Sequence, residues 1–206
     1  MAIKLSDFHK DALREMGNIG AGNAATALSQ LLGKDVSLSV PKVLMVPVDK
    51  MVDRIESKNE IVAAVYLKIF GDITGRALMI FPQNKVFLIV DLLMRRPLGT
   101  TKEFGENEQS ALKEIGNILI SSYMNAIAKL MGLNSVPSVP ALAVDMVEAV
   151  FQTVSAEIAE TGSEALLIET DMVEETAKIQ ATVFLIPDEE SMRKILKALD
   201  NTASGA

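Results

Sequence analysis

The chain of 206 residues contains no cysteine and no tryptophan, and it has a single histidine. The absence of cysteine excludes disulfides, thiol nucleophiles and thiolate zinc sites. One histidine excludes multi-histidine metal sites and argues against a Ser/His/Asp triad. No apolar run approaches the ~18 residues of a membrane span, and the N-terminus carries no signal-peptide pattern. The sequence therefore predicts a protein without a membrane span, and we expect it in the cytoplasm.

The charge balance also limits the partners. Twenty Lys and Arg residues stand against 27 Asp and Glu residues, which gives a net charge of −7. Because every phosphate contact needs a cation, an acidic chain is a poor binder of polyanions. We therefore expect no nucleic-acid partner. The apolar fraction of 49% is ordinary for a globular protein of this size.

An internal repeat organises the chain. Residues 11–19 reappear 99 positions later as residues 110–118, and the match continues without a gap for some thirty residues. A match of this length indicates a duplicated unit of about 100 residues. We predict a single domain, 1–206, made of two repeats at about 7–97 and 106–200.

The elements of each half follow from periodicity and from turn residues. In the first half we predict a helix, three strands and a second helix. Their ranges, in this order, are 7–32, 36–48, 61–70, 73–81 and 85–94. The second half predicts the same order, with an added helical segment after residue 146, at 107–131, 138–146, 164–173, 177–186 and 188–199. Short connections between strands favour hairpins. The predicted class is α+β, with a mainly antiparallel sheet, two long helices packed on it and pseudo-twofold symmetry between the halves.

The first long helix has a polar stripe. At 100° per residue, Asp11, Glu15 and Asn18 share an arc of about 60°. The opposite side is apolar, and we expect it to be anchored in the core by Leu13, Met16 and Leu31. The second copy places Ser110, Glu114 and Asn117 in the same geometry.

Two interpretations of this stripe are open. An outward Glu and Asn are most often a solvated face, but here Glu-x-Gly-Asn survives in both halves although Asn and Gly are weak helix formers. The glycine-rich stretch 17–22 lacks the Lys-Ser/Thr of a phosphate-binding loop and does not follow a strand. We therefore expect Gly17 and Gly116 to allow close helix packing, or the approach of a partner beside the Asn, and we do not expect a phosphate-binding loop.

The spacing of the two motifs resembles the signature of a known family. Asp11-x3-Glu15-x2-Asn18-x22-Pro41 and its twin Ser110-x3-Glu114-x2-Asn117-x22-Pro140 are similar to the motifs of the CheC/CheX/FliY family of bacterial chemotaxis phosphatases. The resemblance covers nearly the whole chain in length, duplication and both motifs. It implies hydrolysis of the aspartyl phosphate of the response regulator CheY.

The resemblance also implies residue roles. Asn18 and Asn117 would orient the attacking water, and Glu15 and Glu114 would engage the lysine beside the phosphoryl group. The residues expected to shape the two sites are Asp11, Pro41, Ser110 and Pro140. No metal or cofactor is expected in this chain, whereas Mg²⁺ is expected in CheY.

A second partner implied by the resemblance is CheD, a receptor deamidase. The helical segment found only in the second half could offer it a docking face, formed by Asp145, Val147, Val150 and Phe151. The alternative, that these apolar residues are core, is equally open. The expected assembly is a monomer or a heterodimer with CheD.

A non-catalytic role is the competing hypothesis. The flagellar switch protein FliM has a similar middle domain without the acid–amide pairs, so the chain could instead be an adaptor that binds CheY or CheD. The intact Glu and Asn in both halves favour the enzyme.

Overall fold

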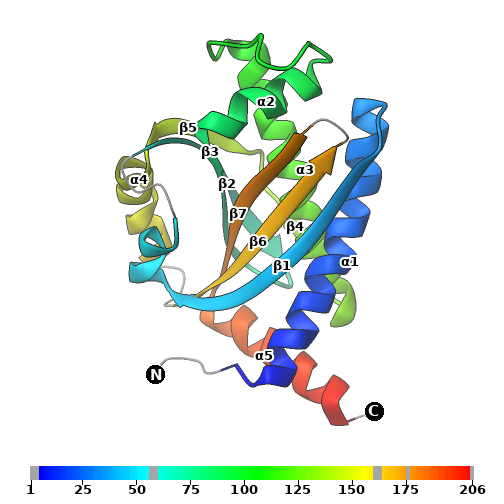
Figure 1. Ribbon diagram of the computed structural model, residues 1–206. Helices are drawn as coiled ribbons and strands as arrows, with labels where there is room; N and C mark the ends of the chain where they lie inside the picture. Colours follow the sequence, from blue (N-terminus) through cyan, green and yellow to red (C-terminus); the bar gives the residue numbers. More distant parts are fainter. Residues whose placement is uncertain (1–4, 56–59, 160–163, 175–176, 205–206) are drawn as a thin grey trace.

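The computed structural model describes residues 5–55, 60–159, 164–174 and 177–204, and Figure 1 shows their arrangement. The first half contains two α-helices, two 3-10 turns and three strands, in the order α1 (Asp7–Leu32), β1 (Val36–Pro47), η1 (Val48–Lys50), η2 (Val52–Arg54), β2 (Ile61–Gly71), β3 (Gly75–Pro82) and α2 (Gln83–Leu93). The second half contains α3 (Glu106–Leu130), β4 (Ser135–Pro137), β5 (Ala141–Met146), α4 (Val147–Ala159), β6 (Glu164–Glu174), β7 (Ala177–Pro187) and α5 (Glu189–Ser204).

The ends of α1 follow from its terminal residues. The Ser6 side chain caps the first turn, where its Oγ accepts a hydrogen bond from the backbone N–H of His9. Gly33 ends the helix in a left-handed conformation with φ 67°, which a residue without Cβ adopts without strain. The predicted helix 7–32 is therefore confirmed.

The strands of the two halves interleave in one antiparallel sheet. Its order within the described residues is β1-β6-β7-β3-β2-β4, with β5 also paired to β2. The two hairpins, β2–β3 and β6–β7, meet through the β3–β7 pair. The strands before each hairpin pair with the hairpin of the other half: β1 pairs with β6, and β4 and β5 both pair with β2. This exchange is the pseudo-twofold arrangement that the repeat predicts, and the α+β class is confirmed.

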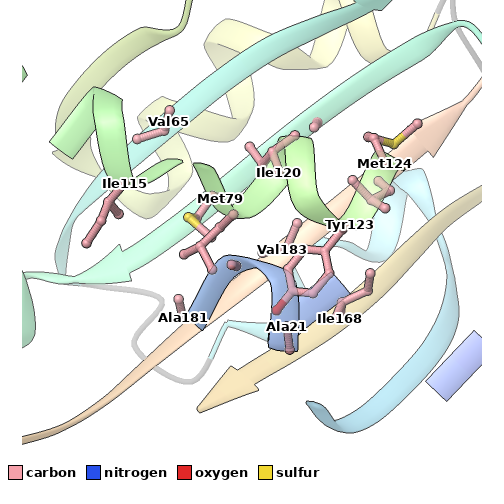
Figure 2. Close-up of a cluster of buried hydrophobic side chains, with 14 of the residues drawn as sticks. Ala21, Val65, Met79, Ile115, Ile120, Tyr123, Met124, Ile168, Ala181 and Val183 are labelled. Atoms are coloured by element: carbon pink, nitrogen blue, oxygen red, sulfur yellow. The ribbon is translucent and has the colours of Figure 1, made fainter. Parts of the chain in front are cut away.

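The sheet has a core on each side. The larger one lies between the sheet and the helices α1 and α3, and Figure 2 shows part of it around Tyr123 and Met79. The smaller one lies under α4 and the two 3-10 turns, and it includes Met51, Val147 and Phe184. None of the helices in the described part of the chain combines the length and the apolarity needed to cross a bilayer.

One predicted core anchor is wrong. Leu13 and Met16 are buried, but the side chain of Leu31 is 41% exposed. In the second half of α1 the buried residues follow each other at four-residue spacing, as Gly20, Ala24, Leu28 and Leu32. Because four residues turn the helix by about 400°, the buried stripe winds around the helix and leaves Leu31 outside it.

Candidate functional site

The two acid–amide pairs lie on the surfaces of α1 and α3, which pack side by side on the same side of the sheet (Figure 1). Glu15 and Asn18 are exposed, as is Glu114, and Asn117 is half-buried. Within each pair the two side chains are three residues apart, so they are neighbours on one helix face. The structure thus places both predicted pairs where another protein can reach them.

A glycine inside each motif brings the helix close to the sheet. A Cβ placed on Gly17 would lie 3.2 Å from Cγ1 of Val40, on β1. A Cβ placed on Gly116 would lie only 2.6 Å from Cγ1 of Val65, on β2. The close-packing interpretation of these glycines is therefore confirmed. Each Asn follows directly after the residue at which its helix touches the sheet.

In the first half, the strand supports the amide directly. The pairing of β1 with β6 shifts register between Ser39 and Lys42, which leaves Val40 and Pro41 in a bulge. The backbone N–H of Val40 donates to Oδ1 of Asn18 at 3.0 Å. This hydrogen bond fixes the orientation of the amide, because Oδ1 must point to the strand and the NH₂ group then points away from it.

The remaining first-site residues lie around this pair. Asp11, one turn before Glu15, is exposed and forms a 3.0 Å ion pair with Arg14. Pro41 is exposed beside Val40. Proline has no backbone N–H, so within the bulge it is Val40 that donates to the Asn18 amide. The structure therefore brings together the first-site residues in one exposed region.

The second half has the same residue types in its motif, but their hydrogen bonds and the adjacent strand differ. Residues Ser138–Pro140 separate β4 from β5, and the register against β2 shifts by one residue across them. Oδ1 of Asn117 accepts a hydrogen bond from the Ser121 hydroxyl at 3.4 Å, one turn along the same helix. Ser110 is exposed and Pro140 is half-buried. The amide of Asn117 is thus supported by its own helix.

The segment predicted to dock CheD is mostly core. Val147 and Val150 are buried, at 0% and 2% exposure, and belong to the smaller core. The prediction that these two residues form an apolar docking face is therefore wrong, because their side chains pack on the sheet. Asp145 is exposed, and its Oδ1 accepts the N–H of Met146 at 2.7 Å. Phe151 is half-buried and lines a groove between α4 and the 3-10 turns.

Comparison with known proteins matches residues 8–45 and 108–143 to the CheC-like family, one segment in each half. The chain is 35% identical over 193 residues to "CheY-P phosphatase CheC" of Bacillus subtilis, and the match covers 92% of both chains. The chain belongs to the CheC-like family. The matched segments contain both acid–amide pairs together with Pro41 and Pro140.

A second relative and a solved structure also match the chain. "Flagellar motor switch phosphatase FliY" of B. subtilis is 30% identical over 128 residues, which are 62% of this chain and 30% of that protein. The crystal structure of Thermotoga maritima FliY has the same fold, with a TM-score of 0.76 at 20% identity, and covers 97% of this chain and 99% of the other. The predicted enzyme class, a phosphatase, is confirmed by the curated relatives.

Sequence reasoning missed three contributors to the sites. They are the Val40 peptide N–H, the Val65 side chain that covers Gly116, and the outward position of Val139. The repeated Ser-Val-Pro was a signal for the bulges, since proline within a strand favours a bulge or an edge. The shared Ser-Val-Pro itself does not distinguish the two valines, although the residues on either side of it differ.

Proposed function

We propose that this protein hydrolyses the aspartyl phosphate of the chemotaxis response regulator CheY at two sites, one on α1 and one on α3. The observation that carries the proposal is the pair of acid–amide stripes at the surface of equivalent helices, each of which packs closely on the sheet at its motif glycine. The 35% identity to a CheY-P phosphatase over nearly the whole chain supports the substrate.

The chemistry asks for positioning more than for strong acids or bases. An acyl phosphate has a good leaving group: the water oxygen forms a bond to phosphorus while the bond to the aspartyl oxygen breaks. The products are inorganic phosphate and the free carboxylate, and the water proton leaves with the phosphate. Holding that water in line is the task of a fixed polar group.

An amide suits this task. Asn18 Oδ1 has two lone pairs, and the Val40 N–H occupies one of them. The other lone pair can accept a water proton, and the NH₂ can donate to the phosphoryl group. Removing one positioned group of this kind costs on the order of 3 kcal/mol of barrier in other enzymes.

The carboxylates fit a docking role. Glu15 and Glu114 are exposed one turn before each amide, where a carboxylate can pair with an ammonium group of the regulator. Such a contact would set the register of the amide over the phosphoryl group. The Mg²⁺ of the reaction would come with the regulator.

The test uses CheY of the same organism, labelled with acetyl phosphate, and measures the rate of phosphate loss. We expect Asn18→Ala and Asn117→Ala each to remove the contribution of one site, and the double variant to leave the intrinsic rate of CheY. The matched controls are Asn23→Ala on α1 and Asn125→Ala on α3, two exposed asparagines outside the motifs. Full activity in the double variant would show that the assigned amides are not the catalytic groups.

The same assay separates the adaptor hypothesis. An adaptor would bind phosphorylated CheY, and the phosphate half-life would not change. Binding with an unchanged half-life would therefore replace the phosphatase proposal by the adaptor.

A second proposal concerns CheD. We propose that it contacts the groove beside α4, which is lined by Val48, Met51, Val52 and Phe151 together with Asp49, Glu148 and Gln152. The groove is mostly apolar and also has acidic groups in its lining, and in the place of α4 the described residues of the first half have the short 3-10 turns η1 and η2. Phe151→Ser should weaken CheD binding in a titration, and Asp145→Asn tests the exposed carboxylate nearby. Unchanged binding in both variants would exclude this groove.

A further inference from the structure

The two copies of Ser-Val-Pro place their valines oppositely. Val40 is 3% exposed and covers Gly17, whereas Val139 is 89% exposed. Val139 is the most exposed of the large apolar side chains in the described residues, ahead of Val136 at 60%. A single exposed valine is common on protein surfaces, so the contrast with its twin is the feature that needs a cause.

The cause is the residue that covers Gly116. In the second half this place is occupied by Val65 of β2, whose Cγ1 lies 2.6 Å from the position of an added Cβ. Figure 2 shows Val65 beside the turn of α3 that carries Ile115. Val65 thus takes the place over Gly116 that Val40 takes over Gly17, and Val139 points outward.

The outward position is fixed by hydrogen bonds. The N–H of Ser138 donates to the Lys68 carbonyl at 2.8 Å, and the Lys68 N–H donates to the Ser138 hydroxyl at 3.0 Å. The same hydroxyl donates to the Val139 carbonyl at 3.0 Å. An apolar side chain held in water by a rigid backbone loses little entropy when a partner covers it.

Val139 belongs to the second motif segment: it stands one residue before Pro140, between β4 and β5. Leu142, three residues further on, pairs with Val65, and Val65 touches the helix at Gly116, next to Asn117. In the first half the equivalent bulge reaches the amide itself, since Val40 N–H bonds Asn18.

We propose that Val139 is an apolar docking residue for the phosphorylated regulator, acting at the second site alone. The inference rests on the proposed function and adds to it a contact that the first site lacks. The regulator would cover Val139 when Asn117 reaches its phosphoryl group. The effect belongs to binding, because Val139 has no group that takes part in the chemistry.

The test isolates the second site with Asn18→Ala and adds Val139→Ser. We expect KM to rise about tenfold, equivalent to about 1.4 kcal/mol, and kcat to change less than twofold. Val139→Ile, which keeps an apolar side chain, should leave KM close to that of the Asn18→Ala protein. In the Asn117→Ala background, where only the first site acts, Val139→Ser should change nothing.

Val136→Ser is the matched control. Val136 is an exposed valine three residues away, and it pairs with Phe70 on β2. Because alternate residues of β2 face opposite sides, Phe70 and its partner lie on the face away from Val65 and α3. An equal rise of KM in Val136→Ser, or an unchanged KM in Val139→Ser, would overturn the inference.

A binding measurement keeps this test separate from the proposed function. CheY carrying beryllofluoride, a stable mimic of the phosphoryl group, is titrated into the Asn18→Ala protein with and without Val139→Ser. About tenfold weaker binding supports the docking role even if the second site proves inactive. Equal affinity overturns it even if the second site is fully active.

Discussion

The closest packing inside a motif gives the sharpest prediction about the fold. Gly116 carries no positive φ, so its replacement by alanine is a question of space alone. The added Cβ would meet three atoms of Val65, at 2.6, 2.8 and 3.0 Å. Since one of these is Cβ of Val65, a change of rotamer cannot clear the contact, and α3 must move away from β2.

The magnitude follows from two opposing effects. Alanine gains about 1 kcal/mol over glycine inside a helix. Overpacking a filled interface costs about 1 to 3 kcal/mol and here meets a contact at the severe end. We expect Gly116→Ala to lower the free energy of unfolding by about 1 to 2 kcal/mol, which in a chain of this size lowers Tm by about 2 to 8 °C.

Two glycines of α1, one inside the first motif and one outside it, provide the comparison. Gly17→Ala meets Val40 at 3.2 Å, which a small shift can relieve, so its two effects nearly cancel. Gly22 has no atom within 4 Å of an added Cβ, and Gly22→Ala should raise stability by up to about 1 kcal/mol. In urea unfolding, we expect Gly22→Ala to be the most stable of the three variants, Gly17→Ala the next and Gly116→Ala the least stable. A Gly116→Ala protein as stable as Gly22→Ala would refute the reasoning.

The same variant tests the link from packing to activity. Moving α3 away from β2 displaces Glu114 and Asn117 together, and a misplacement of about 1 Å can cost up to a hundredfold in rate. In the Asn18→Ala background, Gly116→Ala should therefore lower kcat at least tenfold. In the Asn117→Ala background it should leave the first site close to its normal rate.

Two further predictions concern buried polar groups. Tyr123 and Thr170 share a 2.7 Å hydrogen bond in the core, and burial raises the pKa of the Tyr123 hydroxyl to about 12, so it stays protonated. Tyr123→Phe should cost about 1 to 3 kcal/mol in urea unfolding because the Thr170 hydroxyl loses its partner; adding Thr170→Val should recover most of this, and no recovery would contradict the pairing. Burial alone would raise the pKa of Asp91, but hydrogen bonds from Thr101, Thr100 and Gly99 hold it below its usual range. Asp91 therefore stabilises the fold above its unfolded pKa of about 4, and this contribution is lost as pH falls through the lower folded value; Asp91→Asn should cost about 2 kcal/mol at pH 7 and progressively less below pH 4, measured by unfolding at each pH.

The repeat made the long helices and the exposed motifs predictable. A stripe of Asp11, Glu15 and Asn18 opposite an apolar face can only point to solvent once the helix packs on a sheet. Most strands were also predicted close to their observed bounds, because alternation and turn residues are local signals. The predicted strand 138–146 is the exception, since the structure has β4 before residues 138–140 and β5 after them. These parts of the fold depend on residues near one another in the chain.

The pairing of the strands was not predictable in the same way. Alternation shows which side chains share a face, and it does not show which strand lies beside which. That β1 pairs with β6 of the other half depends on contacts more than 100 residues apart. The same reason explains Val147 and Val150: their helical spacing suits a docking face or a core equally, and the sheet beneath them decides.

The two sites are therefore copies in sequence and not in environment. One glycine is covered by the valine of its own Ser-Val-Pro, and the other is covered by a valine from β2. In the first half this leaves Val40 N–H to fix Asn18 before any partner arrives, which avoids about 0.5 to 1.5 kcal/mol of ordering on binding. In the second half, the amide of Asn117 accepts a hydrogen bond from Ser121 of its own helix, and Val139, the counterpart of Val40, is exposed. The two proposed sites thus share the same acid–amide pair and differ in the residues that surround it.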